Sequence, residues 1–277
     1  MSLAVWILAV AAGAFGQLID AAAGMGFGAF SSSIMLAGGL SPVLVVSTVN
    51  LAKVGSGFSS GLFHWRLGNV RWAWVAPLAI PGLVGGGIAA MALVHLPDAV
   101  ARLWVPVVLV AMGLLILRSF LFKPALPPVA GGSQGVAPAL TEGRWRTLRG
   151  VPADGPSRLR LGGIGFVGGV LNGVSGAFGP FVTSSVLLYR EKQPRYAVGT
   201  VSVAEFFVAA GTSALLLWRL NWATFRWQLP VALIVGAVLI APLGAWLARY
   251  LPARALGVTI ALVLVGINSW SIWRVLT

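Results

Sequence analysis

Two charged side chains lie inside long apolar stretches at matching positions. Lys53 and Glu205 each follow a proline, Pro42 or Pro194, by 11 residues. Proline suits the first turn of a helix, and at about 1.5 Å per residue each charge would lie roughly 16 Å along its helix, near the centre of a bilayer about 30 Å thick. Charges at this depth are costly and usually functional, so both residues are candidates for a site.

The chemistry that these residues could perform is ion binding. A buried lysine ammonium attracts an anion, and a nearby carboxylate can exchange a proton or neutralise the lysine when no anion is bound. A purely structural ion pair is the alternative. Asp20 is a third charge in an apolar segment and a second candidate partner for Lys53. We therefore assign Lys53 to substrate binding, and Asp20 and Glu205 to proton coupling or ion pairing.

Glycines interrupt two of the apolar stretches. Irregular backbone at membrane depth is tolerated only inside protein or beside a watery cavity. Each break would expose N–H groups at the positive end of a half-helix, which suits an anion. Close helix packing is the alternative reading of such glycines. Because the breaks recur at matched positions we favour a substrate site, made of Gly24, Gly26 and Gly28 in the first motif and Gly176 and Gly179 in the second.

Polar residues accompany both charges on the same predicted helices. Asn50 precedes Lys53 by three positions, as Ser202 precedes Glu205, and residues at this spacing share a helix face. Hydroxyls in helices commonly just bond their own helix's carbonyls. The predicted substrate-binding set nevertheless includes Asn50, Thr200 and Ser202. We expect neither a metal nor a cofactor, because the chain has no cysteine and only two histidines, far apart.

The composition sets the environment of these residues. Of the 277 residues 58% are hydrophobic and 9% are charged, against about 25% charged in soluble domains, and the mean hydropathy is +0.92. The apolar runs are continuous and do not alternate as membrane β-strands do. The net charge of +13 sits mainly in short connections, which is a signal of topology and not of nucleic-acid binding. We predict an all-α, polytopic transmembrane helical bundle.

A polar linker divides the apolar runs into two sets of five. The predicted regions are a first membrane repeat (1–121), a cytoplasmic linker (122–160) and a second membrane repeat (161–277). Two runs, Met25 to Ala37 and Leu161 to Leu171, are shorter than the roughly 17–25 residues that a span needs, so they are expected to be half-helices or re-entrant legs. The other runs are Leu3 to Ile19, Pro42 to Phe63, Ala73 to His95, Val100 to Leu121, Ala177 to Tyr189, Pro194 to Trp218, Trp227 to Tyr250 and Ala253 to Trp273.

The two sets of runs are related by a constant offset. A shift of 152 residues places Lys53 on Glu205 and also matches Gly16 with Gly168, Asp20 with Asn172, Gly24 with Gly176 and Pro42 with Pro194. An odd number of segments in each repeat forces the two repeats into opposite orientations, as in many secondary transporters. We therefore predict two inverted repeats with glycine-broken or re-entrant helices at the centre.

The basic residues predict the orientation in the membrane. If successive segments alternate sides, one side receives the linker and most of the 19 basic residues, Lys53 lies within the membrane, and the other side receives only Arg102, Arg219, Arg226 and Arg274. The positive-inside rule then places the linker in the cytoplasm and both termini outside. The first segment lacks a basic leading region, so we expect it to be an uncleaved membrane segment and not a signal peptide.

Several of these motifs together resemble the TauE/SafE family of sulfite exporters. Its members are membrane transporters similar to 4-toluene sulfonate uptake permeases. The motifs include the stretch from Gly16 through Asp20 to Gly28, Thr48-Val-Asn50-Leu-Ala-Lys53 and Gly199-Thr200-Val-Ser-Val-Ala-Glu205. The resemblance implies export of sulfite or a related organosulfur anion across a bacterial inner membrane. Ser202 departs from the asparagine expected there by analogy with Asn50.

The expected function is secondary transport of a small anion by alternating access of the two repeats. An anion channel is the nearest alternative, and a carrier for another anion such as an organosulfonate is a further one. An enzyme is not expected, because neither an H-E-x-x-H motif nor a nucleophile elbow with suitable partners occurs. The expected partners are the anion and membrane lipid, without nucleic acid, and a homodimer is one option for assembly.

Overall fold

The computed structural model describes residues 2–23, 26–122, 157–188, 194–221, 223, 225–247 and 253–277. These residues form helices and no β-strand, which confirms the predicted all-α class. The helices are α1 (Leu3–Ala23), α2 (Phe27–Ala37), α3 (Pro42–Arg66), α4 (Trp72–His95), α5 (Asp98–Phe122), α6 (Arg158–Ser175), α7 (Gly179–Leu188), α8 (Pro194–Leu220), α9 (Gln228–Leu247) and α10 (Ala253–Leu276).

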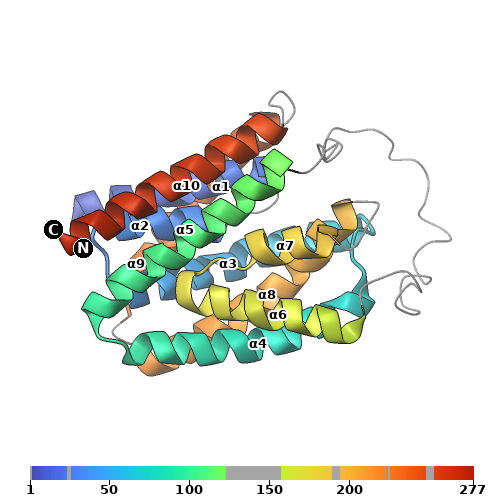
Figure 1. Cartoon of the computed structure of the whole chain (residues 1–277), viewed down its shortest axis with the longest axis horizontal. Helices are drawn as coiled ribbons and strands as arrows, with labels where there is room; N and C mark the ends of the chain where they lie inside the picture. The colour runs from blue at the N-terminus through green and yellow to red at the C-terminus, as the bar shows by residue number, and fades with distance from the viewer. Residues whose placement is uncertain are drawn as a thin grey trace.

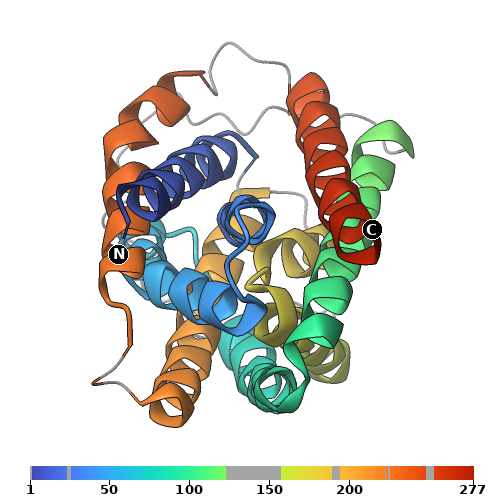
Figure 2. The same ribbon diagram turned by 90° about the vertical axis from the view of Figure 1, so that its left-hand side faces the viewer.

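The helices form one bundle along the long axis of the molecule (Figure 1). Both termini lie at the same end, whereas α5 ends and α6 begins at the opposite end. In the view turned by 90°, the short helix α2 lies in the middle of the bundle (Figure 2). The bundle therefore surrounds one of the two short helices that follow the glycine breaks.

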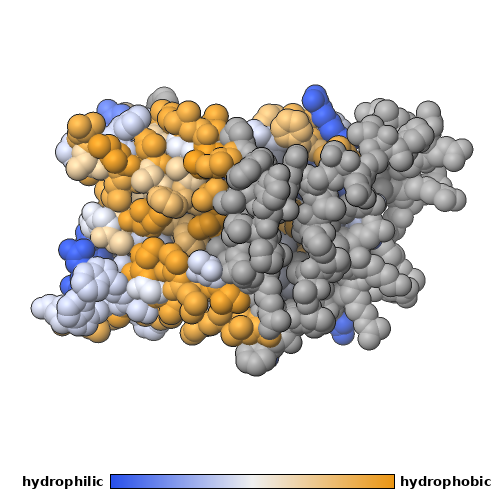
Figure 3. Space-filling model, turned by 90° about the horizontal axis from the view of Figure 1, so that it is seen from above, coloured by the Kyte–Doolittle hydropathy of each residue, from blue (hydrophilic) through white to orange (hydrophobic). Residues whose placement is uncertain are grey.

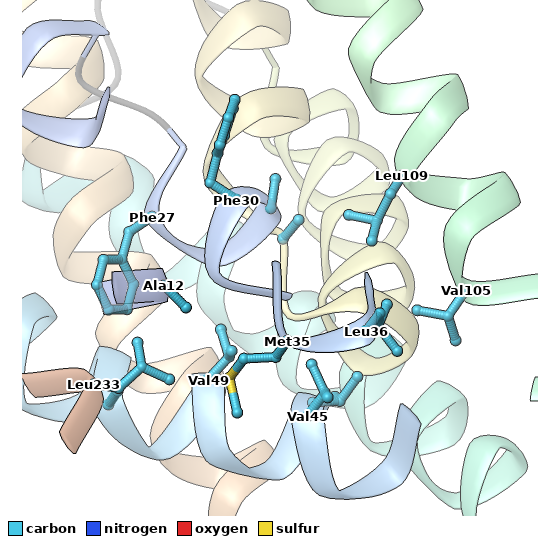
Figure 4. Close-up of a cluster of buried hydrophobic side chains, with 14 of the residues drawn as sticks. Ala12, Phe27, Phe30, Met35, Leu36, Val45, Val49, Val105, Leu109 and Leu233 are labelled. Atoms are coloured by element: carbon cyan, nitrogen blue, oxygen red, sulfur yellow. The ribbon is translucent and has the colours of Figure 1, made fainter. Parts of the chain in front are cut away.

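Helices from the two halves of the chain pack on each other. The most extensive contacts join α4 with α6, α1 with α9, α5 with α10 and α3 with α8. The buried cluster around α2 shows the same mixing, because it joins Phe30 and Met35 of α2 with Val49 of α3, Leu109 of α5 and Leu233 of α9 (Figure 4). Neither half of the chain builds this core alone.

The surface of the bundle is apolar where helices face outward. Ile80, Val84 and Ile88 follow one face of α4 and are exposed, as are Val238 and Leu239 on α9. The described part of the face in Figure 3 is largely hydrophobic. Four described helices carry apolar stretches long enough to cross a membrane, in α1, α4, α5 and α8. Large exposed apolar surfaces on long apolar helices fit lipid as the surrounding solvent.

Helix α6 is longer at both ends than the short run expected there. It begins at Arg158 and not at Leu161, because the Ser157 side chain accepts a hydrogen bond from the Arg160 amide at 3.3 Å and caps the helix. It also continues past Leu171 to Ser175, so it has 18 residues and reaches the length of a span. Helices α2 and α7 have 11 and 10 residues, about 15–17 Å at 1.5 Å per residue, which is half the thickness of a bilayer.

Glycines allow α4 and α6 to cross at very short range. A Gly→Ala substitution in α6 should therefore lower the stability only where the glycine faces α4. A Cβ at Gly169 of α6 would lie 2.0 Å from the carbonyl oxygen of Gly82 in α4, whereas a Cβ at Gly163 meets nothing within 4 Å. We expect Gly169→Ala to lower the free energy of unfolding by about 1–3 kcal/mol through overpacking. The matched variant Gly163→Ala should be neutral or stabilising. Thermal unfolding in detergent measures both, and equal midpoints would contradict the close crossing of α4 and α6.

Candidate functional site

Helices α3 and α8 cross in opposite directions at the centre of the bundle. A Cβ added at Gly57 would lie 3.4 Å from Phe206 Cα, and one added at Gly61 would lie 3.3 Å from Val203 Cγ2. As residue numbers rise along α3, their neighbours on α8 therefore fall. Because each predicted charge is 11 residues from the proline that begins its helix, this antiparallel crossing brings the two charges together.

Lys53 is the centre of the resulting polar cluster. Its Nζ lies 2.6 Å from Glu205 Oε1, and it donates hydrogen bonds to Asn172 Oδ1 at 2.8 Å and to the Gly176 carbonyl oxygen at 2.9 Å. The Lys53 side chain is 4% exposed and that of Glu205 is 23% exposed. A buried ammonium needs such partners. All three acceptors come from the second half of the chain, so this cluster joins the halves.

Asn172 is the residue of this cluster that the sequence prediction missed. Its Nδ2 donates to Asn50 Oδ1 at 2.7 Å, while Asn50 Nδ2 donates to the Val46 carbonyl oxygen at 3.0 Å. The two amides thus form a chain that fixes the Asn172 oxygen toward Lys53. The signal was available, because Asn172 is the counterpart of Asp20 under the 152-residue offset.

The two glycine breaks also meet here. Gly176 ends α6 in a left-handed conformation, with φ 74°, which favours glycine. A Cβ at Gly28 would lie 2.0 Å from the Gly176 carbonyl oxygen, so only glycine allows this approach. Ser32 Oγ donates to the Ser175 carbonyl oxygen at 2.7 Å, and Gly26 caps the N-terminus of α2. The break in one half therefore packs directly on the break in the other.

Asp20 lies in the last turns of α1, and its side chain reaches the N-terminus of α2. Its Oδ1 accepts a hydrogen bond from the Phe27 amide at 3.3 Å, where the positive end of a helix favours an anion. Asp20 also interacts electrostatically with Glu205 and Lys53, while the described ion pair of Lys53 is with Glu205. Asp20 thus belongs to the cluster without being the direct partner of the lysine. Gly24, the remaining glycine of the first motif, lies outside the described residues.

Three other predicted residues lie near the cluster in sequence but make different contacts. Gly179 is buried and begins α7 directly after the second break. Thr200 Oγ1 accepts a hydrogen bond from the Arg71 amide at 2.9 Å, which fastens α8 to the segment before α4. Ser202 Oγ donates to the Val198 carbonyl oxygen of its own helix at 3.0 Å. Thr200 and Ser202 therefore bind backbone groups in this conformation, and their role toward a substrate stays a prediction.

A groove on the bundle surface is separate from this cluster. It has a volume of about 520 Å³ and is lined by residues of α4 and α6, among them Trp72, Pro77, Pro81 and Arg158. None of the predicted site residues lines it. The candidate site is therefore the Lys53 cluster.

The amide chain predicts how Asn172 contributes to stability. In Asn172→Ala, Lys53 loses one acceptor and the buried Asn50 oxygen loses its donor. An unsatisfied buried polar group costs about 1–3 kcal/mol, so we expect a clear drop in the thermal midpoint in detergent. Ser202→Ala is the matched control, because it removes only a bond within α8 and should change the midpoint little. Equal thermal unfolding midpoints for the two variants would contradict a stabilising role of the hydrogen bonds that Asn172 makes with Lys53 and Asn50.

Comparisons with known proteins agree with this picture. The sequence profile described as "Sulfite exporter TauE/SafE" matches residues 9–269, nearly the whole chain. The chain belongs to the TauE/SafE family. It is also 31% identical over 259 residues to the "Probable membrane transporter protein YtnM" of Bacillus subtilis (strain 168), covering 93% of this chain and 79% of that protein. No solved structure gives a significant match.

Family membership confirms the resemblance drawn from the motifs. The matched region of the TauE/SafE family contains all ten described helices in whole or in part, and it contains every residue of the Lys53 cluster. The chain is thus a multi-pass membrane protein of a transporter family, and the Lys53 cluster is a buried polar site within it.

Proposed function

We propose that this protein is a secondary transporter that exports sulfite, or a related small sulfur-containing anion, by alternating access. The observation that carries this proposal is the Lys53 cluster, in which a buried cation lies where the broken helices of the two halves meet. Substrate sites of many transporters lie at such repeat interfaces, next to discontinuous helices. A compact oxyanion suits one ammonium together with amide donors.

Three features support two inverted repeats as the moving parts. Both termini lie at one end of the bundle, while α5 ends and α6 begins at the other end (Figure 1). Helices pair across the halves in an exchanged pattern, in which α1 on α9 corresponds to α6 on α4 under the repeat. Helices α3 and α8 occupy equivalent positions and run in opposite directions. Rocking of one half against the other would open the cluster to each side in turn.

The ion pair explains how a proton would be coupled to the anion. In the described conformation the Glu205 carboxylate neutralises Lys53 at 2.6 Å. An incoming anion competes with that carboxylate, and a buried carboxylate without a partner is unfavourable. Protonation of Glu205 removes the competition and leaves the ammonium free for the anion. Anion binding and proton uptake should therefore occur together, and the gradients of both then set the direction of net flux.

The proposed setting is the bacterial inner membrane. The first repeat (1–121) and the second repeat (161–277) would span it, with the linker in the cytoplasm and both termini in the periplasm. The basic residues support this orientation, because few of them fall on the side of the termini.

Counterflow in proteoliposomes tests the proposed function. Vesicles loaded with unlabelled sulfite should accumulate labelled sulfite from outside transiently, and the initial rate should saturate with concentration. A channel gives neither trans-stimulation nor uphill accumulation of label. Competition with 4-toluenesulfonate in the same assay ranks an organosulfonate against sulfite. Absence of flux for both anions, in vesicles that contain folded protein, would contradict the proposal.

A further inference from the structure

The Lys53 ammonium is held in the way that proteins hold a small cation. Its three acceptors are oxygens of three kinds, a carboxylate of Glu205, a side-chain amide of Asn172 and a backbone carbonyl of Gly176, at 2.6–2.9 Å. Hard cations take such mixed sets of oxygen ligands. The ammonium is tethered to α3 and donates hydrogen bonds to these oxygens, whereas a soluble ion would be coordinated by them.

The position of the Gly176 oxygen also favours the binding of a cation. Gly176 ends α6, and its carbonyl lies at the negative end of that helix, where a cation is stabilised. In transporters with discontinuous helices, unwound carbonyls and half-helix C-terminal ends coordinate the coupling Na⁺. Here the Gly176 carbonyl likewise lies at the C-terminal end of a broken helix, and it accepts a hydrogen bond from Lys53 Nζ.

We propose that Lys53 occupies, as a tethered cation, the place that a soluble coupling cation takes in cation-driven carriers. Transport by this protein therefore needs neither Na⁺ nor K⁺. A tethered cation cannot cross the membrane, so we assign the coupled charge to the proton on Glu205, the carboxylate that pairs with Lys53. This inference rests on the proposed function only in taking the Lys53 cluster as the transport site.

The inference predicts that removing the tether creates a site for a soluble cation. In Lys53→Ala, the oxygens of Glu205, Asn172 and Gly176 remain, and one of them carries a negative charge. The experiment measures thermal unfolding in detergent in NaCl, KCl or methylammonium chloride, against N-methylglucamine chloride at equal ionic strength. At ten times its dissociation constant, a bound cation should raise the midpoint of Lys53→Ala by about 3–6 °C.

Two controls make this shift specific. The parent protein, whose ammonium fills the position, should show equal midpoints in all four salts. The double variant Lys53→Ala/Glu205→Gln lacks the charge of the site and should lose the shift. A Lys53→Ala protein that responds to none of the three cations, or a double variant that responds as strongly, would overturn the inference.

A flux measurement provides a second arm that needs no variant. Parent proteoliposomes should transport sulfite at the same rate when N-methylglucamine replaces all Na⁺ and K⁺, and a tenfold or greater loss would overturn the inference even if Lys53→Ala fails to fold. The two arms separate this inference from the proposed function. The unfolding shift is measured without sulfite and at constant chloride, so it can succeed when sulfite is not the substrate. Sulfite flux that depends on Na⁺ would instead uphold transport and reject the tethered cation.

Discussion

Lys53→Ala should abolish sulfite binding and transport. Lys53 is the cation of the buried cluster, and its loss leaves the Glu205 carboxylate to repel an incoming anion. A hydrogen bond to a charged group contributes about 1.5–3 kcal/mol, so the lost attraction alone weakens binding about 10- to 100-fold. Repulsion by the carboxylate adds to this. Sulfite binding by calorimetry and flux in proteoliposomes measure the effect, and undiminished flux would reject Lys53 as the site.

Two further variants separate loss of binding from loss of folding. Removing one partner of a buried ion pair is strongly destabilising, whereas removing both is often tolerated. Lys53→Ala/Glu205→Gln should therefore unfold at a higher temperature than Lys53→Ala and still fail to bind sulfite. Arg102→Ala is the matched control for loss of a positive charge, because Arg102 pairs with Asp98 at the exposed start of α5. Its flux should stay within about twofold of the parent, since exposed pairs contribute little.

The meeting of Lys53 and Glu205 was predictable from sequence for a simple reason. Both lie 11 residues from the proline that begins a helix, and a two-fold relation between antiparallel helices brings equivalent mid-helix positions together. The apolar runs likewise predicted the helices, because backbone groups in lipid must bond within their own segment. These features depend on spacing and hydropathy, which the sequence displays directly.

The partners within the cluster were not predictable in the same way. Asn172 contacts Lys53, whereas its counterpart Asp20 caps α2, so equivalent residues have different roles. Thr200 is predicted to bind the substrate, and the sequence did not indicate that its hydroxyl accepts a hydrogen bond from the Arg71 amide. Such choices depend on side-chain rotamers and on the exact crossing of helices. A repeat offset fixes which positions correspond, but it does not fix which atoms meet.

The asymmetry between the two halves has a functional consequence. Exact two-fold symmetry would place like residues opposite each other, but this chain has a lysine on α3 and a glutamate on α8. The pair is neutral only while both partners are charged and together. Under the proposed function, a proton on the carboxylate or an anion on the ammonium would change that balance and so affect both halves at once.

Glu205→Gln should remove the dependence of anion binding on pH that comes from the site. In the parent protein the Glu205 carboxylate pairs with Lys53, so under the proposed function an anion that takes its place binds together with a proton. Binding by the parent should therefore strengthen as pH falls. Glutamine is neutral at every pH and cannot form the ion pair. At about pH 8 we expect the variant to bind the anion about tenfold more tightly than the parent, since a charged hydrogen bond contributes about 1.5–3 kcal/mol.

Comparing variants with the same anion isolates the contribution of Glu205, because sulfite itself takes up a proton near neutral pH while 4-toluenesulfonate stays ionised. Asp98→Asn is the matched control, as it removes an exposed carboxylate that pairs with Arg102, and its pH profile should follow the parent. Flux of 4-toluenesulfonate through Glu205→Gln should no longer move protons, which a pH-sensitive dye inside the vesicles detects. If the Gln variant keeps both the parent's pH profile and its proton movement, another group carries the proton, and Asp20 at the start of α2 is then the next carboxylate to test.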